Sequence, residues 1–379
     1  MASDIGLERY YSPSQWSIPV LVDKSLTVDE LLARHVRQLT LWSRQSRSSA
    51  AARADFSVSY AHDDFDTPEA GCAGDDGHRR RRRPSNPRGE EEFDWFPPDD
   101  TGPGIRQLVV YLHGGYWQEL SLEQSVHFAQ RITDRPNCCF ASLSYLLSPW
   151  QSVEEMTRRV CVGLRRVVAW TRRRQRELAG EAEESTASRD ELRVCLMGHS
   201  AGAHLALTAG LVGFESGLPA DADWLACLDR MVLLSGIYDL RPLVETSVNR
   251  SGRLFKDELA AWRSSPLRWF LDRHDDRCRE TVRRLATPLP DSIGLVPAGP
   301  RGRRMPDRVS YLVAWAEHDS PMFKRQSRLM AASLRADRPD ADGVHEFCAR
   351  GQDHFGLVES LCLPADESDM LRRLGDFLA

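Results

Sequence analysis

Long apolar runs are missing from this sequence, and none approaches the ~18 residues of a membrane-spanning helix, so we expect no membrane segment. The opening, MASDIGLERYY, has no apolar core of signal-peptide length, and we expect no secretory leader. Lysine is scarce: only Lys24, Lys256 and Lys324 occur among 50 basic residues, and the formal net charge is −5. A general nucleic-acid binder needs a basic surface, so nucleic acid is disfavoured as a partner.

The cysteine pattern of a disulfide framework is also missing. The number of cysteines is odd, no C-x-x-C occurs, and several cysteines lie within apolar, strand-like runs. We therefore predict buried free thiols and a cytoplasmic protein. The nine are Cys72, Cys138, Cys139, Cys161, Cys195, Cys227, Cys278, Cys348 and Cys362.

The first hundred residues divide into two parts. Residues 1–60 hold an aromatic-rich opening, ERYYSPSQW, and a helical pattern near 27–46, and we expect them to pack on the main domain. Residues 61–104 are polar and lack the apolar periodicity of a packed core, which predicts a disordered insertion. Its run Arg79–Arg83 is either a nuclear-targeting or nucleic-acid patch, which would give a nuclear fraction, or a solvated loop. The acidic Glu90–Glu92 that follows favours the solvated loop.

Residues 105–379 alternate short apolar runs with helical patterns, which predicts an α/β fold whose mostly parallel sheet has helices on both faces. The expected strands are 107–112, 138–144, 192–197, 231–235, 309–315 and 344–348. The expected helices are 121–132, 153–178, 201–212, 321–337 and 367–378. Polar helices and a Pro/Gly-rich loop interrupt the alternation at 240–307, which indicates a small cap with an insertion.

Gly198-His199-Ser200-Ala201-Gly202 matches the motif G-x-S-x-G. This short motif also occurs by chance, so the segments on either side decide how it is interpreted. The apolar run 192–197 precedes it and the Ala/Leu-rich run 201–212 follows it. A strand, a tight turn and a helix hold a serine at a strained elbow with its hydroxyl exposed. The sequence therefore predicts Ser200 as a nucleophile, and the alternative is a glycine-rich turn without chemistry.

A serine nucleophile needs a base, and the base needs an orienting acid. In α/β hydrolases the acid and then the histidine follow the serine along the chain, each on a loop after a strand. Asp319 follows the run VSYLVAW and is the favoured acid. Asp239, in GIYDL after the preceding strand, is the alternative, although it also suits a helix N-cap.

Three late histidines compete as the base. His354 is favoured because it lies in a loop between the last strand and the final helix, where a base can reach the serine. His318 directly precedes the acid, and His345 lies within a strand. A metal site is the alternative role of the histidines at 113, 199 and 204, but no carboxylate or cysteine completes a ligand set. We therefore expect neither a metal nor a cofactor.

His113-Gly114-Gly115-Tyr116-Trp117 follows another buried strand and suits an oxyanion hole. Attack on a carbonyl creates an oxyanion, and each preorganised donor lowers the barrier by about 3–4 kcal/mol. The N–H groups of Gly115, Tyr116 and Ala201 are the predicted donors, because the glycines let the backbone approach the substrate. Tyr116 and Trp117 would wall the cleft. For Trp117 a place in the core is equally open.

The motifs together resemble the kynurenine formamidases, also called arylformamidases, among the esterase/lipase-like α/β hydrolases. Where related lipases and esterases have HGGG, the aromatic pair after two glycines favours the formamidases. The resemblance covers most of the chain outside the insertions at 61–104 and 285–307. It rests on YYSPSQW at 10–16, HGGYWQ at 113–118, GHSAGAHLA at 198–206, SGIYDLRPLVETSVN at 235–249, HDSPMFKRQS at 318–327 and DHFGLVE at 353–359.

The resemblance implies an α/β-hydrolase fold and the hydrolysis of N-formyl-L-kynurenine to L-kynurenine and formate, a step of tryptophan breakdown. It implies Ser200, Asp319 and His354 as the triad, and Gly115 and Tyr116 as oxyanion donors. We expect the small-molecule substrate as partner and neither nucleic acid nor a membrane.

Other functions stay open at this stage. A general carboxylesterase would use the same machinery on small acyl esters, and the leaving-group pocket near the 240–307 cap would decide between the two. An inactive hydrolase fold used for binding is disfavoured, because the serine, the acid and the histidine are all present. The oligomeric state is open, a homodimer included.

Overall fold

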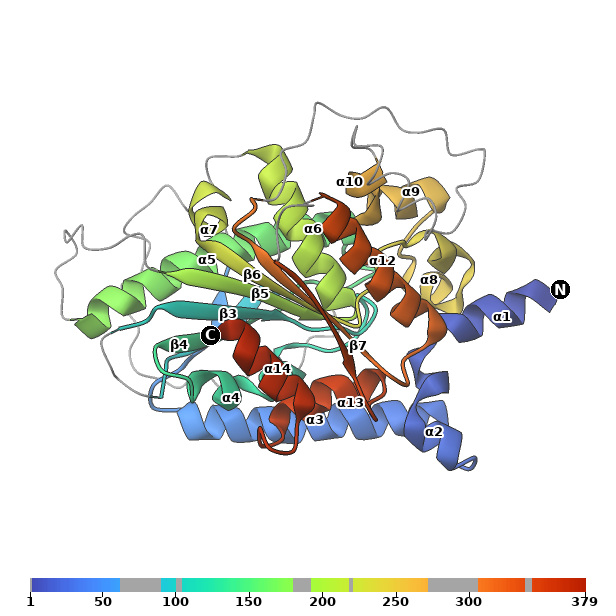
Figure 1. The fold of residues 1–379 in the computed structure, drawn as a ribbon, viewed down its shortest axis with the longest axis horizontal. Helices are drawn as coiled ribbons and strands as arrows, with labels where there is room; N and C mark the ends of the chain where they lie inside the picture. The colour runs from blue at the N-terminus through green and yellow to red at the C-terminus, as the bar shows by residue number, and fades with distance from the viewer. Residues whose placement is uncertain are drawn as a thin grey trace.

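One mixed sheet forms the centre of the molecule, and helices lie on both of its faces (Figure 1). The computed structural model describes residues 2–61, 90–99, 104–179, 192–217, 221–271, 306–337 and 343–379. Within these ranges eight strands pair in the order β1-β2-β4-β3-β5-β6-β7-β8. The pairs from β4 to β8 are parallel, whereas β1 and β2 join antiparallel at one edge. The bounds are β1 Asp55–Ser59, β2 Glu92–Phe96, β3 Gln107–Leu112, β4 Cys138–Leu143, β5 Arg193–His199, β6 Leu228–Leu234, β7 Ser310–Ala316 and β8 Val344–Ala349.

The helices fall into two layers and a cap. The α-helices are α1 Ala2–Tyr10, α2 Ile18–Val22, α3 Val28–Ala50, α4 Ala129–Thr133, α5 Val153–Ala179, α6 Ala201–Ser216, α7 Ala222–Cys227, α8 Ser247–Gly252, α9 Glu258–Arg263, α10 Leu267–Leu271, α12 Pro321–Asp337, α13 His354–Glu359 and α14 Asp369–Leu378. The 3-10 helices are η1 Pro13–Trp16, η2 Leu122–Gln124, η4 Arg241–Glu245 and η5 Ser360–Cys362. Among the described helices, none combines the length and the apolar character that crossing a lipid bilayer requires.

The central strands are apolar on both faces because a helical layer covers each face. In β3, Leu108 and Val110 point into one core cluster, which α5, α6 and α12 cover. Val109 and Tyr111 point into the opposite cluster, which α4, α13 and α14 cover. Continuous apolar strands of this kind are typical of parallel sheets, and they confirm the predicted α/β architecture.

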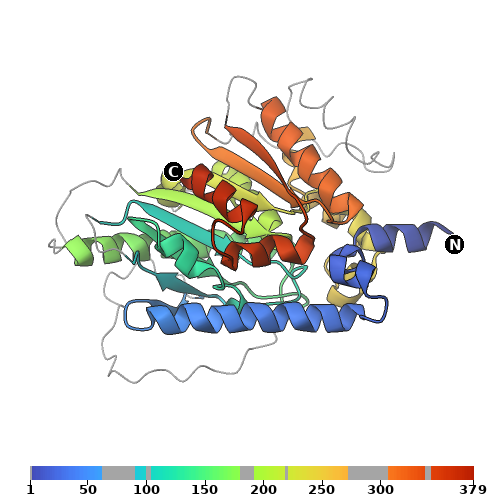
Figure 2. The ribbon, with the colours of Figure 1, turned by 60° about the horizontal axis from the view of Figure 1, so that its bottom comes forward.

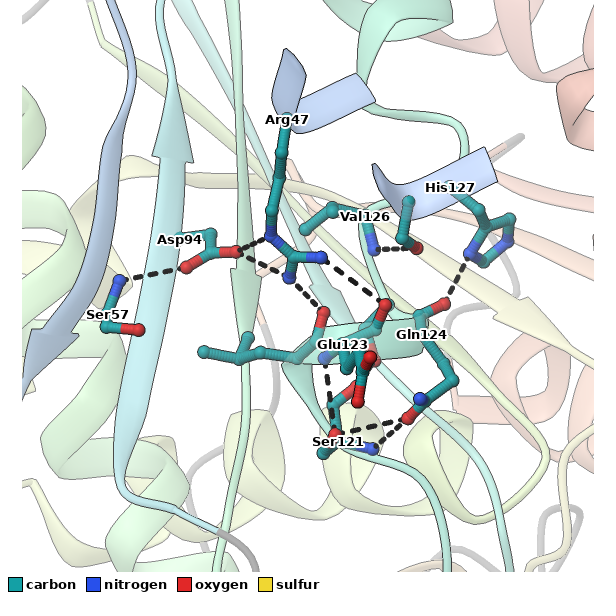
Figure 3. Close-up of polar contacts among 11 residues, drawn as sticks. Arg47, Ser57, Asp94, Ser121, Glu123, Gln124, Val126 and His127 are labelled. Atoms are coloured by element: carbon teal, nitrogen blue, oxygen red, sulfur yellow. Dashed lines mark hydrogen bonds and ion pairs between the residues drawn. The ribbon is translucent and has the colours of Figure 1, made fainter. Parts of the chain in front are cut away.

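The N-terminal segment packs along the main domain through α3. This helix begins with a capping box in which Thr27 and Glu30 bind each other's backbone N–H. It runs along the lower side of the molecule beside α4 and α13 (Figure 2). Near its end the buried Arg47 donates to Asp94 of β2, at 2.8 Å from Nε to Oδ2 (Figure 3). α3 is therefore tied to the edge of the sheet.

The polar segment 61–104 contains a strand that the sequence did not predict. β2 buries Phe93, Trp95 and Phe96, and it pairs with β4 along its whole length. The prediction of an insertion without packed structure is therefore wrong for 92–96, because a tertiary pairing buries this short apolar run. Residues 62–89, which hold the arginine run, lie outside the described residues, as do 272–305 of the predicted second insertion.

The helix predicted at 121–132 is two short pieces, η2 and α4. In Figure 3 the Arg47 guanidinium donates to the carbonyl oxygens of Leu122 and Glu123, and His127 Nδ1 lies 2.9 Å from the carbonyl oxygen of Gln124. Side chains thus occupy carbonyls that a continuous helix would bond to its own backbone. The other predicted helices are present within a few residues of their expected ends.

Free thiols are found at every described cysteine, as predicted. Burial was predicted correctly for most of them, but Cys348 is exposed because β8 is an edge strand, and Cys362 is partly exposed. Cys72 and Cys278 lie outside the described residues.

Candidate active site

Four loops meet at one edge of the sheet. β3, β5, β7 and β8 are parallel, so their carboxyl ends lie at the same edge. The loop after β3 carries the HGGYW motif, and Ser200, Asp319 and His354 follow β5, β7 and β8. Ligands of open α/β sheets bind at this edge.

Ser200 occupies a strained turn between β5 and α6. Its φ of 56° and ψ of −119° are unusual for a residue with a Cβ, and such strain concentrates at functional sites. Its N–H donates to the carbonyl of Leu234 at 2.8 Å, which fixes the turn against β6. Gly202 lets α6 pack closely, since a Cβ there would lie 2.1 Å from the carbonyl oxygen of Leu112. The geometry is that of a nucleophile elbow.

Asp319 and His354 are in direct contact. Nδ1 of His354 lies 3.1 Å from each carboxylate oxygen of Asp319, and both side chains are almost fully buried. Asp319 also accepts the N–H of Ser320 at 2.8 Å. This contact leaves Nε2 of His354 as the ring nitrogen that is free to exchange a proton. His199, next to Ser200, lies with its ring centroid 4.6 Å from that of His354.

The alternative acid and bases have other partners. Asp239 forms a buried ion pair with Arg241, at 2.8 and 2.6 Å. The side chain of His318 is 46% exposed and lies 3.8 Å from Glu317. His345 packs on Phe377 of α14, in the helical layer beyond the sheet. Asp239 and His318 are therefore bound to partners other than Ser200 and His354.

The HGGYW loop lies directly against Ser200. A Cβ on Gly114 would stand 3.2 Å from the Cβ of Ser200. Gly115 has a φ of 94° and accepts the N–H groups of Gln118 and Glu119, which closes a tight turn. Within the described residues, the N–H groups of Gly115 and Tyr116 have no hydrogen-bond acceptor. These donors are therefore available to an anion next to the serine.

A third donor lies on the helix that follows Ser200. Ala201 is the first residue of α6, where backbone N–H groups have no partner within the helix and the helix dipole favours negative charge. Ala201 thus lies directly beside Ser200, and Gly115 and Tyr116 follow Gly114, which lies against Ser200.

The two aromatic residues of the motif have different roles. Trp117 is fully buried and packs edge-on against His204 and Phe255, so it belongs to the core rather than to the cleft wall. Tyr116 is partly exposed, and its hydroxyl donates to the carbonyl oxygen of Tyr11. Both have a positive φ, which marks the loop as strained.

The remaining histidines of the site are neutral. Burial lowers the pKa of His113 to about 4 and that of His204 to about 4, and it holds the pKa of His199 well below the usual range. Each lies within hydrogen-bond distance of a backbone carbonyl, and His113 stacks on Tyr145 at 4.5 Å. These three histidines therefore have a structural role: each holds a backbone segment through its carbonyl oxygen. In the described part of the chain no three His, Cys, Asp or Glu side chains gather as ligands of one metal ion.

The N-terminal segment reaches the site, which the sequence did not predict from residue patterns. Tyr11 is buried, and its carbonyl oxygen accepts the hydroxyl of Tyr116. Its own hydroxyl accepts from Nε2 of Gln326 at 3.0 Å. Gln326 in turn binds the backbone of Tyr238 and Asp239. The motif YYSPSQW at 10–16 was the part of the sequence that could have indicated this. It contributed to the family resemblance, but no chemical role was assigned to it.

Comparisons with known proteins agree with this geometry. A family model described as the alpha/beta hydrolase fold matches residues 109–354. A kynurenine formamidase from Danio rerio is 25% identical over 380 residues, which cover 97% of this chain and 94% of that protein. Another, from Drosophila melanogaster, is 27% identical over 268 residues, 70% of this chain and 71% of that protein.

A solved structure extends the comparison to the fold. A candidate thioesterase from Silicibacter sp. TM1040 has a TM-score of 0.59 and 21% identity, with 97% of each chain covered. At this identity the similarity concerns the fold alone. The residues that the family model matches include the HGGYW loop, Ser200, Asp319 and His354.

Proposed function

The chain belongs to the α/β-hydrolase family, and on this premise we propose that it is an arylformamidase that cleaves N-formyl-L-kynurenine to L-kynurenine and formate. The reaction class is supported above all by the buried contact between His354 and Asp319, at the sheet edge that also carries Ser200. The substrate is supported by the similarity to curated kynurenine formamidases along nearly the whole chain.

Ser200 is the nucleophile of this proposal, and His354 is its base. Nε2 of His354 takes the hydroxyl proton while Oγ attacks the formyl carbon. Asp319 holds the ring through Nδ1 and stabilises the imidazolium that forms. The carbonyl oxygen becomes an oxyanion, which the N–H groups of Gly115, Tyr116 and Ala201 receive.

The second half of the reaction returns the site to its starting state. The C–N bond breaks, and His354 gives its proton to the departing aromatic amine, so that L-kynurenine leaves and a formyl ester remains on Ser200. Water, deprotonated by His354, attacks this ester; the bond to Oγ breaks, formate leaves, and His354 returns the proton to Oγ of Ser200. The acyl group is only a formyl, so the close approach of Gly114 to Ser200 suits it.

The cytoplasm is the compartment that we propose. The cysteines in the described ranges are free thiols, which suits a reducing compartment.

The test is turnover of N-formyl-L-kynurenine beside p-nitrophenyl acetate. We expect strong formamide turnover by the wild type and a loss on the order of 10⁶ in kcat in Ser200→Ala. Ser235→Ala is the matched control, because Ser235 is also buried, has a φ of 42° and follows the neighbouring strand β6. It should keep activity within about threefold.

Two other outcomes would redirect the proposal. Turnover of the ester alone would keep Ser200 as nucleophile and make the protein a carboxylesterase. Activity that survived in Ser200→Ala would refute the assigned nucleophile.

A further inference from the structure

Asp353, the residue before the proposed base, accepts four hydrogen bonds. Its Oδ1 accepts the N–H groups of Phe355 and Gly356 at 3.0 and 2.8 Å, which caps α13. Its Oδ2 accepts the hydroxyl of Ser17 at 2.6 Å and the N–H of Ile18 at 2.9 Å. One buried carboxylate therefore joins the helix that begins at the base to a segment 336 residues away in sequence.

We call the segment Tyr11–Ile18 the strap. It also contacts the HGGYW loop, which carries the proposed oxyanion donors and is called the oxyanion loop below. The carbonyl of Tyr11 accepts the hydroxyl of Tyr116 in the oxyanion loop. Just before the strap, the carboxylate of Glu8 accepts the N–H of Ser247 at 2.8 Å, on the first turn of cap helix α8. The N-terminal chain thus links the oxyanion loop, the cap and the loop of the base.

Hydrogen bonds beside a pocket hold this connection. An open pocket of about 430 Å³ borders it, and Ser17, Ile18 and Asp353 are among the residues that line it. A side chain next to a cavity has few van der Waals contacts on that side. The position of Asp353 therefore depends on its four donors.

The backbone of His354 is held from the opposite side by the nucleophile elbow. Nε2 of His199 lies 3.1 Å from the carbonyl oxygen of His354, and the low pKa of His199 keeps its ring neutral. Asp319 holds the ring of the base, and two further contacts hold the backbone beside it: His199 at the carbonyl oxygen of His354, and Asp353, which the strap binds.

We propose that the strap completes the active site, with Asp353 as a positioning residue that sets the reach of His354 toward Ser200. This rests on the proposed role of His354 as base. Loss of either strap donor lets the start of α13 move while Asp319 and the oxyanion donors stay in place. Because a misplacement of about 1 Å can cost about a hundredfold in rate, the effect falls on kcat rather than on KM.

Two matched pairs of variants in the full-length chain test this. Ile18→Pro removes one N–H donor at the first position of α2, where proline is tolerated, and Ile18→Ala removes the side chain but keeps the N–H. Ser17→Ala removes the hydroxyl donor. Ser12→Ala is its control, since among the described residues that hydroxyl donates only to the carbonyl oxygen of Glu8, in the N-terminal chain itself.

The expected result is a kcat about tenfold lower for Ile18→Pro and Ser17→Ala than for their controls, with KM within about twofold. The rate at which a fluorophosphonate labels Ser200 should fall by the same factor. A merely structural strap would lower the melting temperature and leave the kcat and labelling rate of the folded protein unchanged. Equal kcat within each pair would overturn the proposal.

The readouts separate this proposal from the proposed function. If Ser17→Ala does not fold, the Ile18 pair decides. If the wild type cleaves only p-nitrophenyl acetate, the formamide substrate is wrong, and the kcat ratios on the ester and the labelling rates still decide the role of the strap.

Discussion

Asp239 and Asp319 follow neighbouring parallel strands at the same edge of the sheet, and both are buried, yet they have different partners. Asp239, after β6, is bound by the guanidinium of Arg241, only two residues later in the chain. Asp319, after β7, faces His354, which another loop brings to it. One carboxylate is part of a local ion pair, and the other is part of a contact between two loops.

The partner decides what each carboxylate can do. A guanidinium stays protonated at any ordinary pH, so Arg241 cannot relay a proton between Asp239 and a substrate. An imidazole changes its charge near neutral pH, so Asp319 can stabilise a ring that gains and loses a proton. Burial alone does not distinguish a catalytic acid from a structural one.

The largest expected effect is that of Asp319→Asn. The amide has nearly the shape of the carboxylate but can hold His354 in the wrong tautomer, so we expect kcat to fall by about 10⁴. The unfolding free energy should change by only about 1 kcal/mol. Steady-state kinetics and urea unfolding measure the two effects. A kcat within tenfold of the wild type would break the comparison.

Asp239→Asn should show the opposite pattern. It leaves the buried guanidinium of Arg241 without its counter-charge, so we expect the unfolding free energy to fall by about 3–5 kcal/mol. The kcat of the folded fraction should stay within about threefold of the wild type. Urea unfolding and activity corrected for the folded fraction check this.

The control for Asp239→Asn replaces both members of the ion pair. Asp239→Leu combined with Arg241→Met should regain most of the lost stability, because apolar residues of similar size can replace a buried ion pair. A strong loss of kcat in folded Asp239→Asn would make that carboxylate part of the reaction and contradict the assignment.

Much of the fold could be predicted because its signals are local. Parallel strands covered on both faces are continuous apolar runs, and α5 and α12 carry their helical periodicity within one segment. Ser200 was predictable for the same reason, since the strand, the glycine turn and the helix are adjacent in sequence.

What the sequence left open depends on contacts between distant segments. Asp239 and Asp319 were alternatives because both follow strands, although Arg241 two residues after the first was a local clue to its ion pair. The short run at 92–96 becomes a strand only through its pairing with β4. Nothing near Ser17 indicates that it binds Asp353, because that contact exists only in the folded chain.

The smallest expected effect concerns two buried histidines, His354 and His204, which also differ in their partners. His354 faces a carboxylate, whereas His204 lies 2.7 Å from the carbonyl oxygen of Ser264, and burial lowers its pKa to about 4. The unfolded chain binds a proton at this histidine below about pH 6.5, and the folded chain does so only below about pH 4. Its contribution to stability is therefore complete above pH 6.5 and is lost as the pH falls toward 4.

Removal of this titration should flatten the pH dependence of stability. We expect the drop in unfolding free energy between pH 7 and pH 5 to be about 2 kcal/mol smaller in His204→Gln than in the wild type. Urea unfolding at the two pH values measures it, and comparing each protein with itself cancels the change in packing. Trp117 of the HGGYW loop packs on His204. The same comparison therefore also tests whether the core at this loop requires the ring of His204 to be neutral. An unchanged drop in His204→Gln would show that this histidine already carries a proton in the folded chain at pH 5.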